Sequence, residues 1–299
     1  MINSNISGII NIYKEKGFTS HDVVNIVRKT LGKIKTGHTG TLDPEAEGVL
    51  PVCVGKATKL ADYIASSVKQ YRAEMTLGIT TTTEDHTGEV ISRHAVCLSH
   101  DEVTEAAKSF VGEYYQKPPM YSAVKVNGKK LYELAREGIE IERKTRLIHI
   151  YNIEDITFKQ DNVVEMLVTC SKGTYIRTLC KDIGEKLGCG AHMSALVRTA
   201  SGRFTLDNSI RLDAFKQLVE EGRLDEVLLS PEEALSDYKC VTVSKAAEKY
   251  LINGNKISLN YCDKKLSEGE CVTVFDEENK IVGVYLVMED CIKPLTMLR

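Results

Sequence analysis

Asp43 is an acidic residue whose neighbours can fix the geometry of a backbone. Gly40 precedes it and can adopt a positive φ angle, while Pro44 follows it and disfavours a helical conformation at Asp43. Residues 48–55 are apolar and β-branched, which predicts a buried strand with an interruption at Pro51. A carboxylate on a shaped loop beside a buried strand is held in one geometry, as catalysis requires. Asp-Pro alone is also typical of an ordinary turn, so its meaning depends on the residues that accompany it.

Two further side chains with chemical potential, Tyr175 and Arg177, lie in the segment 170–178. Gly173 predicts a bulge or turn there, and a helix is expected over residues 176–187. The two side chains are two positions apart, so on a strand they would share a face. Such a pair either lines a cleft or forms a structural cation–π contact, and the residues leave both interpretations open.

Strands and helices are expected to alternate through most of the chain. Alternating apolar residues predict strands, and capping residues before periodic apolar positions predict helices. The expected strands cover residues 8–13, 69–78, 147–158 and 163–170. One expected helix begins at Thr19 or Ser20. Three further helices are expected over residues 57–67, 99–111 and 206–235. Small strands and one short helix follow a boundary near residue 236, so we expect a large mixed domain and a small β-rich one.

The composition is typical of a globular protein with a sizeable core. The chain has 299 residues, of which 42% are hydrophobic, enough for one large and one small domain. No apolar run reaches the roughly 18 residues of a membrane span, and the first residues lack the layout of a signal peptide, so we expect a cytoplasmic protein. Nine cysteines occur without a Cys-x-x-Cys pair, which argues against a zinc site and favours small buried hydrophobes.

The charge is unevenly distributed along the chain. The formal net charge is −3, but residues 213–290 hold 9 basic and 17 acidic side chains, which gives −8. Residues 1–212 hold 28 basic and 25 acidic side chains, which gives +3. Within residues 117–146, eight basic residues accompany four glutamates. This segment is either a solvated helix face with ion pairs or a local surface for RNA phosphates.

The segment Gly37-His-Thr-Gly-Thr-Leu-Asp-Pro44 resembles the catalytic loop of the TruB family of tRNA pseudouridine synthases. Four later segments resemble the same family in the same order: Lys69-Gln-Tyr71, Pro118-Pro-Met-Tyr-Ser-Ala-Val-Lys125 with Tyr132–Gly138, Lys172-Gly-Thr-Tyr-Ile-Arg177, and Leu196-Val-Arg-Thr-Ala-Ser-Gly202. Two positions depart from the family pattern, because Glu15 stands where proline is usual and Thr82 where an acid is usual. The resemblance covers nearly the whole chain.

The resemblance implies three catalytic residues. Asp43 is the essential acid, acting as nucleophile or base, and Arg177 pairs with it. An arginine partner favours the ionised carboxylate and fixes its orientation. Tyr71 stacks on the target base, although a tyrosine on a strand also serves ordinary cross-strand packing.

Four residues are implied to contact the substrate or to line its pocket. Tyr175 packs under the active site, and Leu196 forms an apolar wall of the base pocket. Asp85 matches the second acid of a family loop, where it either acts or orders the loop. His38 either fills the stack that a flipped base vacates or makes a local hydrogen bond.

The implied reaction converts uridine to pseudouridine in the T-loop of tRNA, at position 55. It breaks the N1–C1′ bond and joins C5 to C1′, so no redox cofactor and no metal is expected. The uridine must be flipped out of its stack first. The carboxylate attacks the sugar, attacks the base or removes a sugar proton, and the sequence leaves these routes open.

The implied fold is an α+β pseudouridine synthase domain with a central antiparallel sheet over residues 1–235. An RNA-gripping insertion occupies residues 117–146, and a small PUA-like β-barrel occupies residues 236–299. The expected partner is tRNA through its T-stem-loop, with no DNA and no membrane, and the expected state is a monomer. Two alternatives stay open: an RNA-binding or tRNA-folding protein with secondary activity, and a synthase of the same fold that acts on another RNA.

Overall fold

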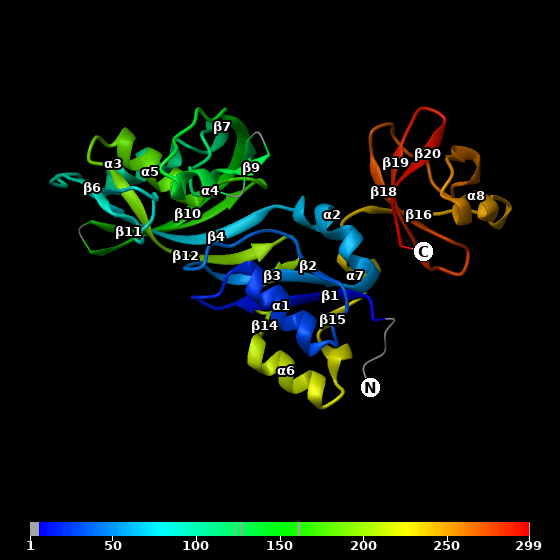
Figure 1. The fold of residues 1–299 in the computed structure, drawn as a ribbon. Coiled ribbons are helices and arrows are strands. Elements are labelled where there is room, and N and C mark those ends of the chain that lie inside the picture. The colour runs from blue at the N-terminus through cyan, green and yellow to red at the C-terminus, as the bar shows by residue number, and fades with distance from the viewer. Residues whose placement is uncertain (1–5, 123, 127, 161, 299) are drawn as a thin grey trace.

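The structure, a computed structural model, describes residues 6–122, 124–126, 128–160 and 162–298, which form a large and a small β-sheet unit (Figure 1). The main path of the larger sheet runs in the order β14 (Ile210–Arg211), β1 (Gly8–Lys14), β3 (Glu47–Val54), β12 (Ala191–Ser201), β4 (Lys69–Leu77), β11 (Val163–Cys170), β10 (Arg146–Gln160) and β7 (Gly112–Gln116). Short strands pair beside it: β2 (Thr36–His38) with β3, β13 (Phe204–Thr205) with β12, and β15 (Leu228–Leu229) with β1. Most pairs are antiparallel, and β1–β14 and β3–β12 are parallel. The expected α+β class with a central, mainly antiparallel sheet is confirmed.

β4 lies inside this sheet, and its sequence explains its register. Buried and partly buried residues alternate along all of Lys69–Leu77, as a strand with one core face requires. Tyr71 lies opposite Arg198 on β12 and opposite Val168 on β11. A slip by one residue would turn Tyr71 and Ala73 away from the core, so the apolar pattern fixes the pairing.

Helices cover the sheet in three groups. α3 (His100–Lys108) and α5 (Ile176–Lys186) pack against β4, β10 and β11 in one buried cluster. α1 (Ser20–Thr30) and α6 (Leu212–Glu220) cover one face of β1 and β3. The 3₁₀ helix η1 (Gly55–Leu60), α2 (Ala61–Ala65) and α7 (Pro231–Ala234) cover the opposite face, because the adjacent residues Ile9 and Ile10 join different clusters.

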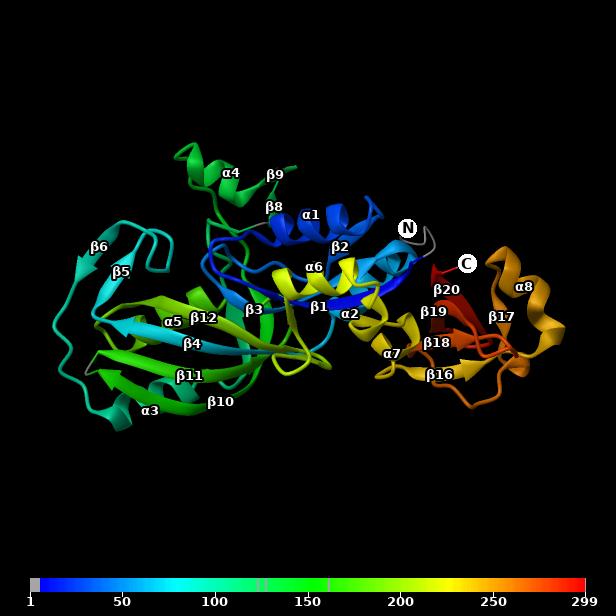
Figure 2. The same ribbon diagram turned by 90° about the horizontal axis from the view of Figure 1, so that it is seen from below.

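Two small elements project from the larger sheet. One is a hairpin of β5 (Ile79–Thr81) and β6 (Val90–Arg93). The other follows Lys117-Pro-Pro and contains β8 (Lys125–Val126), β9 (Lys129–Lys130) and α4 (Leu131–Arg136). Figure 2 shows α4 and α1 on the same side of the larger sheet.

The smaller unit is a sheet in the order β16 (Lys239–Thr242), β18 (Cys271–Phe275), β19 (Ile281–Val287), β20 (Cys291–Met297) and β17 (Ile257–Ser258). Between these strands lie η3 (Lys245–Ala247), α8 (Glu248–Asn253) and η4 (Leu259–Tyr261). Its core is a separate cluster that includes Val241, Leu251 and Tyr285. The short elements expected after residue 236 are present.

The two units share buried apolar contacts. Val284 and Leu298 of the smaller unit belong to the same cluster as Ile64 and Leu60 of the larger one. Lys59 Nζ donates to the Met297 carbonyl at 2.8 Å. The smaller unit is therefore packed against η1 and α2 and is not a free tail.

Several expectations about local structure were wrong. The strand alternative for Tyr175 and Arg177 does not hold, because the expected turn at Gly173 leads directly into the expected helix, α5, and Arg177 lies in its first turn. β3 continues through Pro51 without interruption, and the Pro51 carbonyl accepts a hydrogen bond from the Thr39 N–H at 3.1 Å.

The prediction of a single helix over residues 206–235 was also wrong. That segment is divided into β14, α6, the 3₁₀ helix η2 (Leu224–Glu226), β15 and α7. Its short apolar pieces pair with β1 at Ile210 and Leu228.

Candidate active site

The loop that carries Asp43 connects β2 to β3 and is anchored to α1. Ser20 Oγ, at the start of that helix, donates to the Leu42 carbonyl at 3.1 Å and accepts from the Leu42 N–H at 2.8 Å. Thr19 caps the same helix in a capping box with Asp22. The residue before the catalytic candidate is thus fixed by a capped helix.

Lys14 holds the other side of this loop. Its Nζ donates to the carbonyl of Pro44 at 3.1 Å and to that of Ala46 at 2.6 Å, and the side chain is completely buried. Burial lowers the pKa of Lys14 to about 8, and the attraction of Asp43 opposes this shift. Because one loop carbonyl on each side of Glu45 receives a hydrogen bond, opening of the backbone after Asp43 would cost the buried Lys14 ammonium two of its three hydrogen bonds.

Arg177 binds the Asp43 carboxylate with two of its nitrogens. Nε lies 3.0 Å from Oδ2, and Nη2 donates to Oδ1 at 3.3 Å. The arginine is 5% exposed, while the aspartate side chain keeps 37% of its surface accessible. A two-point contact fixes the plane of the carboxylate as well as its position. Arg177 thus orients the Asp43 carboxylate on one side, and the other side is accessible to a substrate.

The same guanidinium joins two further segments to Asp43. Nη1 donates to the Thr83 carbonyl at 3.1 Å and lies 3.6 Å from Asp85 Oδ2. Nη2 also donates to the Tyr121 carbonyl at 2.8 Å, which belongs to the segment that leads into α4. The first turn of α5 therefore connects the catalytic loop, the loop after β5 and the base of the segment 117–146.

The pKa of Asp43 lies above its usual range. Burial is the largest cause, and the negative charge of Asp85 adds to it. The positive charge of Arg177 acts in the opposite direction and favours the ionised carboxylate. Lys14 also lowers this pKa, so the proton affinity of Asp43 depends on three charged neighbours.

Asp85 orders its own loop. It is 8% exposed, and its Oδ1 accepts from Thr83 Oγ1 at 2.7 Å and from Thr87 N–H at 3.0 Å. Its backbone forms an isolated bridge with Met193 of β12. Asp85 contacts Arg177 rather than open space, so the structure places it behind Asp43.

Tyr71, Leu196 and Leu42 belong to the same buried cluster. Both Tyr71 and Leu196 are 8% exposed. Arg198, which is 1% exposed, lies next to them and donates from Nε to the Val49 carbonyl at 2.6 Å and from Nη2 to the Gly40 carbonyl at 3.3 Å. Burial raises the pKa of Tyr71, and the Arg198 guanidinium opposes this shift. The aromatic floor of the site is therefore tied to the catalytic loop through a buried arginine.

His38 and Tyr175 occupy the margins of the site. His38 Nδ1 accepts from the Gly40 N–H at 3.2 Å, which is the local loop hydrogen bond that the sequence left open. Burial is the largest cause that lowers the pKa of His38, and Arg198 adds to it. Tyr175 precedes α5 at its N-cap, and its backbone is held by Gln116.

The structure brings together Asp43, Arg177, Asp85, Tyr71 and Leu196, and it adds residues to which the sequence assigned no role. Lys14, Gln116 and Ser20 are buried polar side chains that hold the loops. A polar residue at the end of an otherwise apolar strand, as at Lys14, was the available signal.

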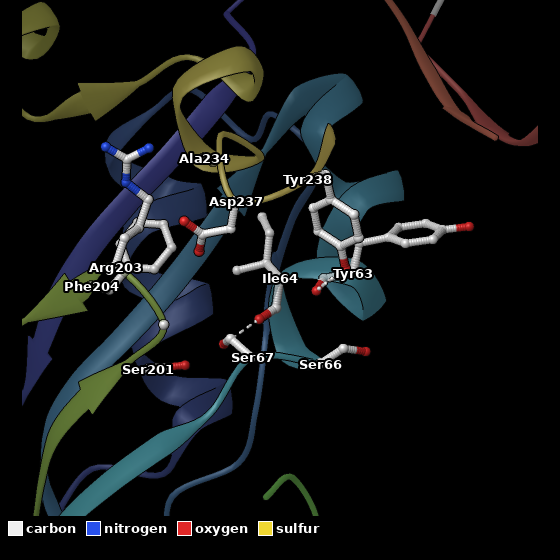
Figure 3. Close-up of a pocket in the computed structure, with 11 residues that line it drawn as sticks. Tyr63, Ile64, Ser66, Ser67, Ser201, Arg203, Phe204, Ala234, Asp237 and Tyr238 are labelled. Atoms are coloured by element: carbon white, nitrogen blue, oxygen red, sulfur yellow. Dashed lines mark hydrogen bonds between the residues drawn. The ribbon is translucent and has the colours of Figure 1, made fainter. Parts of the chain in front are cut away.

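A separate pocket of about 170 Å³ lies between α2, the turn after β12 and the chain before β16 (Figure 3). Tyr63 and Tyr238 meet edge to face at one end, and the Tyr238 hydroxyl donates to the Tyr63 carbonyl at 3.1 Å. Asp43, Arg177 and Tyr71 do not line it. This pocket belongs to the junction of the two units and not to the candidate active site.

The family comparisons agree with this geometry. Residues 28–176 match the model of the TruB family pseudouridylate synthase N-terminal domain. Residues 177–236 match that of the tRNA pseudouridylate synthase B C-terminal domain. The fold and site define a pseudouridine synthase, and the chain belongs to the TruB family of these enzymes.

Curated relatives cover almost the full length. The chain is 50% identical over 287 residues to tRNA pseudouridine synthase B of Alkaliphilus oremlandii, covering 95% of this chain and 94% of that one. It is 45% identical to the protein of the same name from Bacillus pumilus, covering 98% of both chains. These two relatives match well beyond the loop motifs.

Solved structures extend the likeness to the smaller unit. A Cbf5-Nop10-Gar1 complex contains a chain with 28% identity and a TM-score of 0.77, matching 98% of this chain and 85% of its own. An H/ACA RNP bound to a substrate RNA containing 2′-deoxyuridine gives 25% identity and a TM-score of 0.76, again with 98% and 85% covered. The expected synthase fold with a PUA-like C-terminal unit is confirmed.

No helix within the described part of the chain is long and apolar enough to cross a membrane.

Proposed function

We propose that this chain converts the uridine at position 55 in the T-loop of tRNA to pseudouridine. The observation that carries the proposal is Asp43, oriented by two Arg177 nitrogens and open on one side. The names of the relatives, tRNA pseudouridine synthase B, support tRNA as the substrate. In this proposal Asp43, Arg177 and Tyr71 are the catalytic residues.

The reaction rearranges atoms within one nucleotide. The N1–C1′ bond breaks, the base turns, and C5 bonds to C1′. C5 then loses its proton, and N1 gains one. Nothing is oxidised or reduced overall. An ionised carboxylate fixed against the nucleoside serves attack on the sugar, attack on the base or proton removal. Arg177 acts by keeping Asp43 ionised and oriented, whichever of the three routes the enzyme follows.

Access to Asp43 requires that the uridine leave its stack, at a cost of a few kcal/mol. We assign the stacking contact with the flipped base to Tyr71, worth about 1–3 kcal/mol. Leu196, which packs in the same cluster, forms the apolar wall. His38 lies at the end of β2 on the catalytic loop and fills the vacated space in the RNA.

The remaining assignments concern how RNA is held. We assign residues 1–235 to catalysis, residues 236–299 to the PUA-like unit, and the basic segment 117–146 to gripping the T-stem-loop. Arg177 supports the last assignment, because it hydrogen-bonds Tyr121 within that segment. Tyr175 supports the base of the segment, and Asp85 keeps Arg177 in place. We further propose a cytoplasmic monomer.

The test is to incubate the purified wild type and Asp43→Asn with an unmodified tRNA transcript and to map pseudouridine by chemical labelling. We expect labelling at one T-loop uridine with the wild type only. Labelling at another site would contradict the assigned uridine and leave the chemistry intact. Tight tRNA binding without pseudouridine from either protein would contradict the enzyme assignment and favour an RNA-binding or tRNA-folding protein.

A further inference from the structure

A hollow of about 310 Å³ lies between α1 and the chain that leads into β2. Its lining includes four basic residues and no acidic one. The lining consists of His21, Val24, Asn25, Arg28, Lys33, Lys35 and Thr36. A concave surface of a single charge sign focuses its field on ligands of the opposite sign.

The four basic side chains are exposed, and no described residue forms an ion pair with them. The nearest acid in sequence, Asp22, accepts from the Thr19 N–H at 2.9 Å and from Thr19 Oγ1 at 2.6 Å. These hydrogen bonds, with a smaller contribution from His21, lower the pKa of Asp22. Among the described residues, no acid forms an ion pair with Arg28, Lys33 or Lys35, so their positive charge is open to a ligand. Such self-repulsion is relieved when a polyanion binds.

The hollow has a defined frame. His21 and Arg28 are seven residues apart on α1, so they lie on one face about 10 Å apart along the axis. The Lys33 N–H donates to the Arg28 carbonyl at 2.8 Å, and Lys33 adopts φ 69° at the turn that ends the helix. The Lys35 carbonyl accepts from the Gly55 N–H at 2.8 Å. Backbone contacts thus fix the positions of Arg28, Lys33 and Lys35.

Both walls of the hollow lead to the catalytic loop. α1 begins at Ser20, whose hydroxyl is bonded to Leu42, the neighbour of Asp43. β2 begins at Thr36 in the wall of the hollow and ends at His38. An anion in the hollow would therefore be held by the same elements that fix the active site.

We propose that this hollow binds the phosphate backbone of the RNA substrate, next to the nucleotide that enters the active site. The proposal rests on the proposed function and adds a second grip, separate from the segment 117–146. Three exposed cations, Arg28, Lys33 and Lys35, suit a chain of phosphates, which they position without reading sequence.

The test uses two double charge reversals with the same change in net charge. Lys33→Glu with Lys35→Glu alters the hollow. Lys108→Glu with Lys186→Glu is the control, because both lysines are exposed on α3 and α5. Each pair is combined with Asp43→Asn to prevent turnover, and the Kd for an unmodified tRNA is measured as a function of salt. Thermal unfolding of each protein checks that it is folded.

We expect the hollow variant to raise Kd by about tenfold or more at low salt, and the slope of log(1/Kd) against log[salt] to become less negative by about 1.5. The control should change both quantities much less. Equal effects of the two pairs, or no effect of either, would overturn the proposal.

The two proposals fail separately. If the wild type makes no pseudouridine but the hollow variant still weakens tRNA binding, only the enzymatic assignment falls. If the wild type modifies tRNA and the hollow variant binds like its control, only the phosphate site falls.

Discussion

The side-chain amide of Gln116 forms two hydrogen bonds with the backbone of Tyr175. Its Nε2 donates to the Tyr175 carbonyl at 2.9 Å, and its Oε1 accepts from the Tyr175 N–H at 2.7 Å. Gln116 is 1% exposed and ends β7. Tyr175 caps α5 two residues before Arg177, so this amide links the base of the segment 117–146 to the arginine that orients Asp43.

Replacing Gln116 with leucine should lower both stability and turnover. The substitution leaves the Tyr175 N–H without its partner, while the Tyr175 carbonyl still accepts from the Leu179 N–H. The expected cost is about 1–3 kcal/mol of unfolding free energy. The displaced α5 start should lower kcat by about tenfold or more, with little change in the Kd for tRNA. Denaturant unfolding and single-turnover assays measure the two effects.

Gln217→Leu is the matched control, because that amide is exposed and donates to the Glu221 side chain. It should change stability by less than about 0.5 kcal/mol. A Gln116→Leu protein with wild-type kcat would contradict the positioning role.

Arg177→Lys should be strongly defective although it keeps the positive charge. A lysine cannot bind both carboxylate oxygens of Asp43 and also reach the carbonyls of Thr83 and Tyr121. We expect kcat to fall by about 10² or more, because a small misplacement of a catalytic group is enough for such a loss. Single-turnover kinetics with tRNA test this. Arg223→Lys, in an exposed ion-pair cluster, should leave the rate unchanged.

The acid limb of the pH–rate profile should move in opposite directions in two variants. Activity needs ionised Asp43, so the rate falls as the pH drops through its raised pKa. Asp85→Asn removes a charge that raises the pKa of Asp43, so the limb should move to lower pH. Arg177→Met removes a charge that lowers this pKa, so the limb should move to higher pH.

Profiles of single-turnover rates between about pH 4 and 8 decide this prediction. Glu268→Gln, an exposed change in the smaller unit, should not move the limb. Limbs that coincide in all the proteins would show that Asp43 is not the group that titrates.

Lys14 should make stability depend on alkaline pH. Burial lowers its folded pKa to about 8, so between that pH and about 10.4 the unfolded chain binds a proton that the folded chain does not. Folding therefore becomes more favourable as the pH rises through this window. We expect the difference in unfolding free energy between the wild type and Lys14→Met to shift in favour of the wild type as the pH rises from about 8 to 10. Lys16→Met changes an exposed lysine, so its difference in unfolding free energy from the wild type should not depend on pH in this window.

The loop around Asp43 could be predicted because its shape depends on nearby residues. Glycines and Pro44 act on the backbone within a few positions, and the apolar run after them forms β3 as expected. Tyr71 was likewise placed on a strand by simple alternation. Local pattern was sufficient for these features.

Contacts across the chain could not be derived in this way. Arg177 and Asp43 are 134 positions apart, and only the family resemblance suggested their pairing. The alternation argument for Tyr175 and Arg177 failed because Gly173 starts a turn into α5. Gln116, 59 positions from Tyr175, carried no local sign of its partner.

The shared apolar contacts between the two units set a fixed dimension for the whole molecule. Val284 and Leu298 lie in one cluster with Leu60, so the smaller unit cannot swing freely about the chain before β16. The distance between the Asp43 loop and the sheet of the smaller unit is therefore constant. An RNA that contacts both ends would have to match this length, so the spacing would favour substrates by shape as well as by sequence.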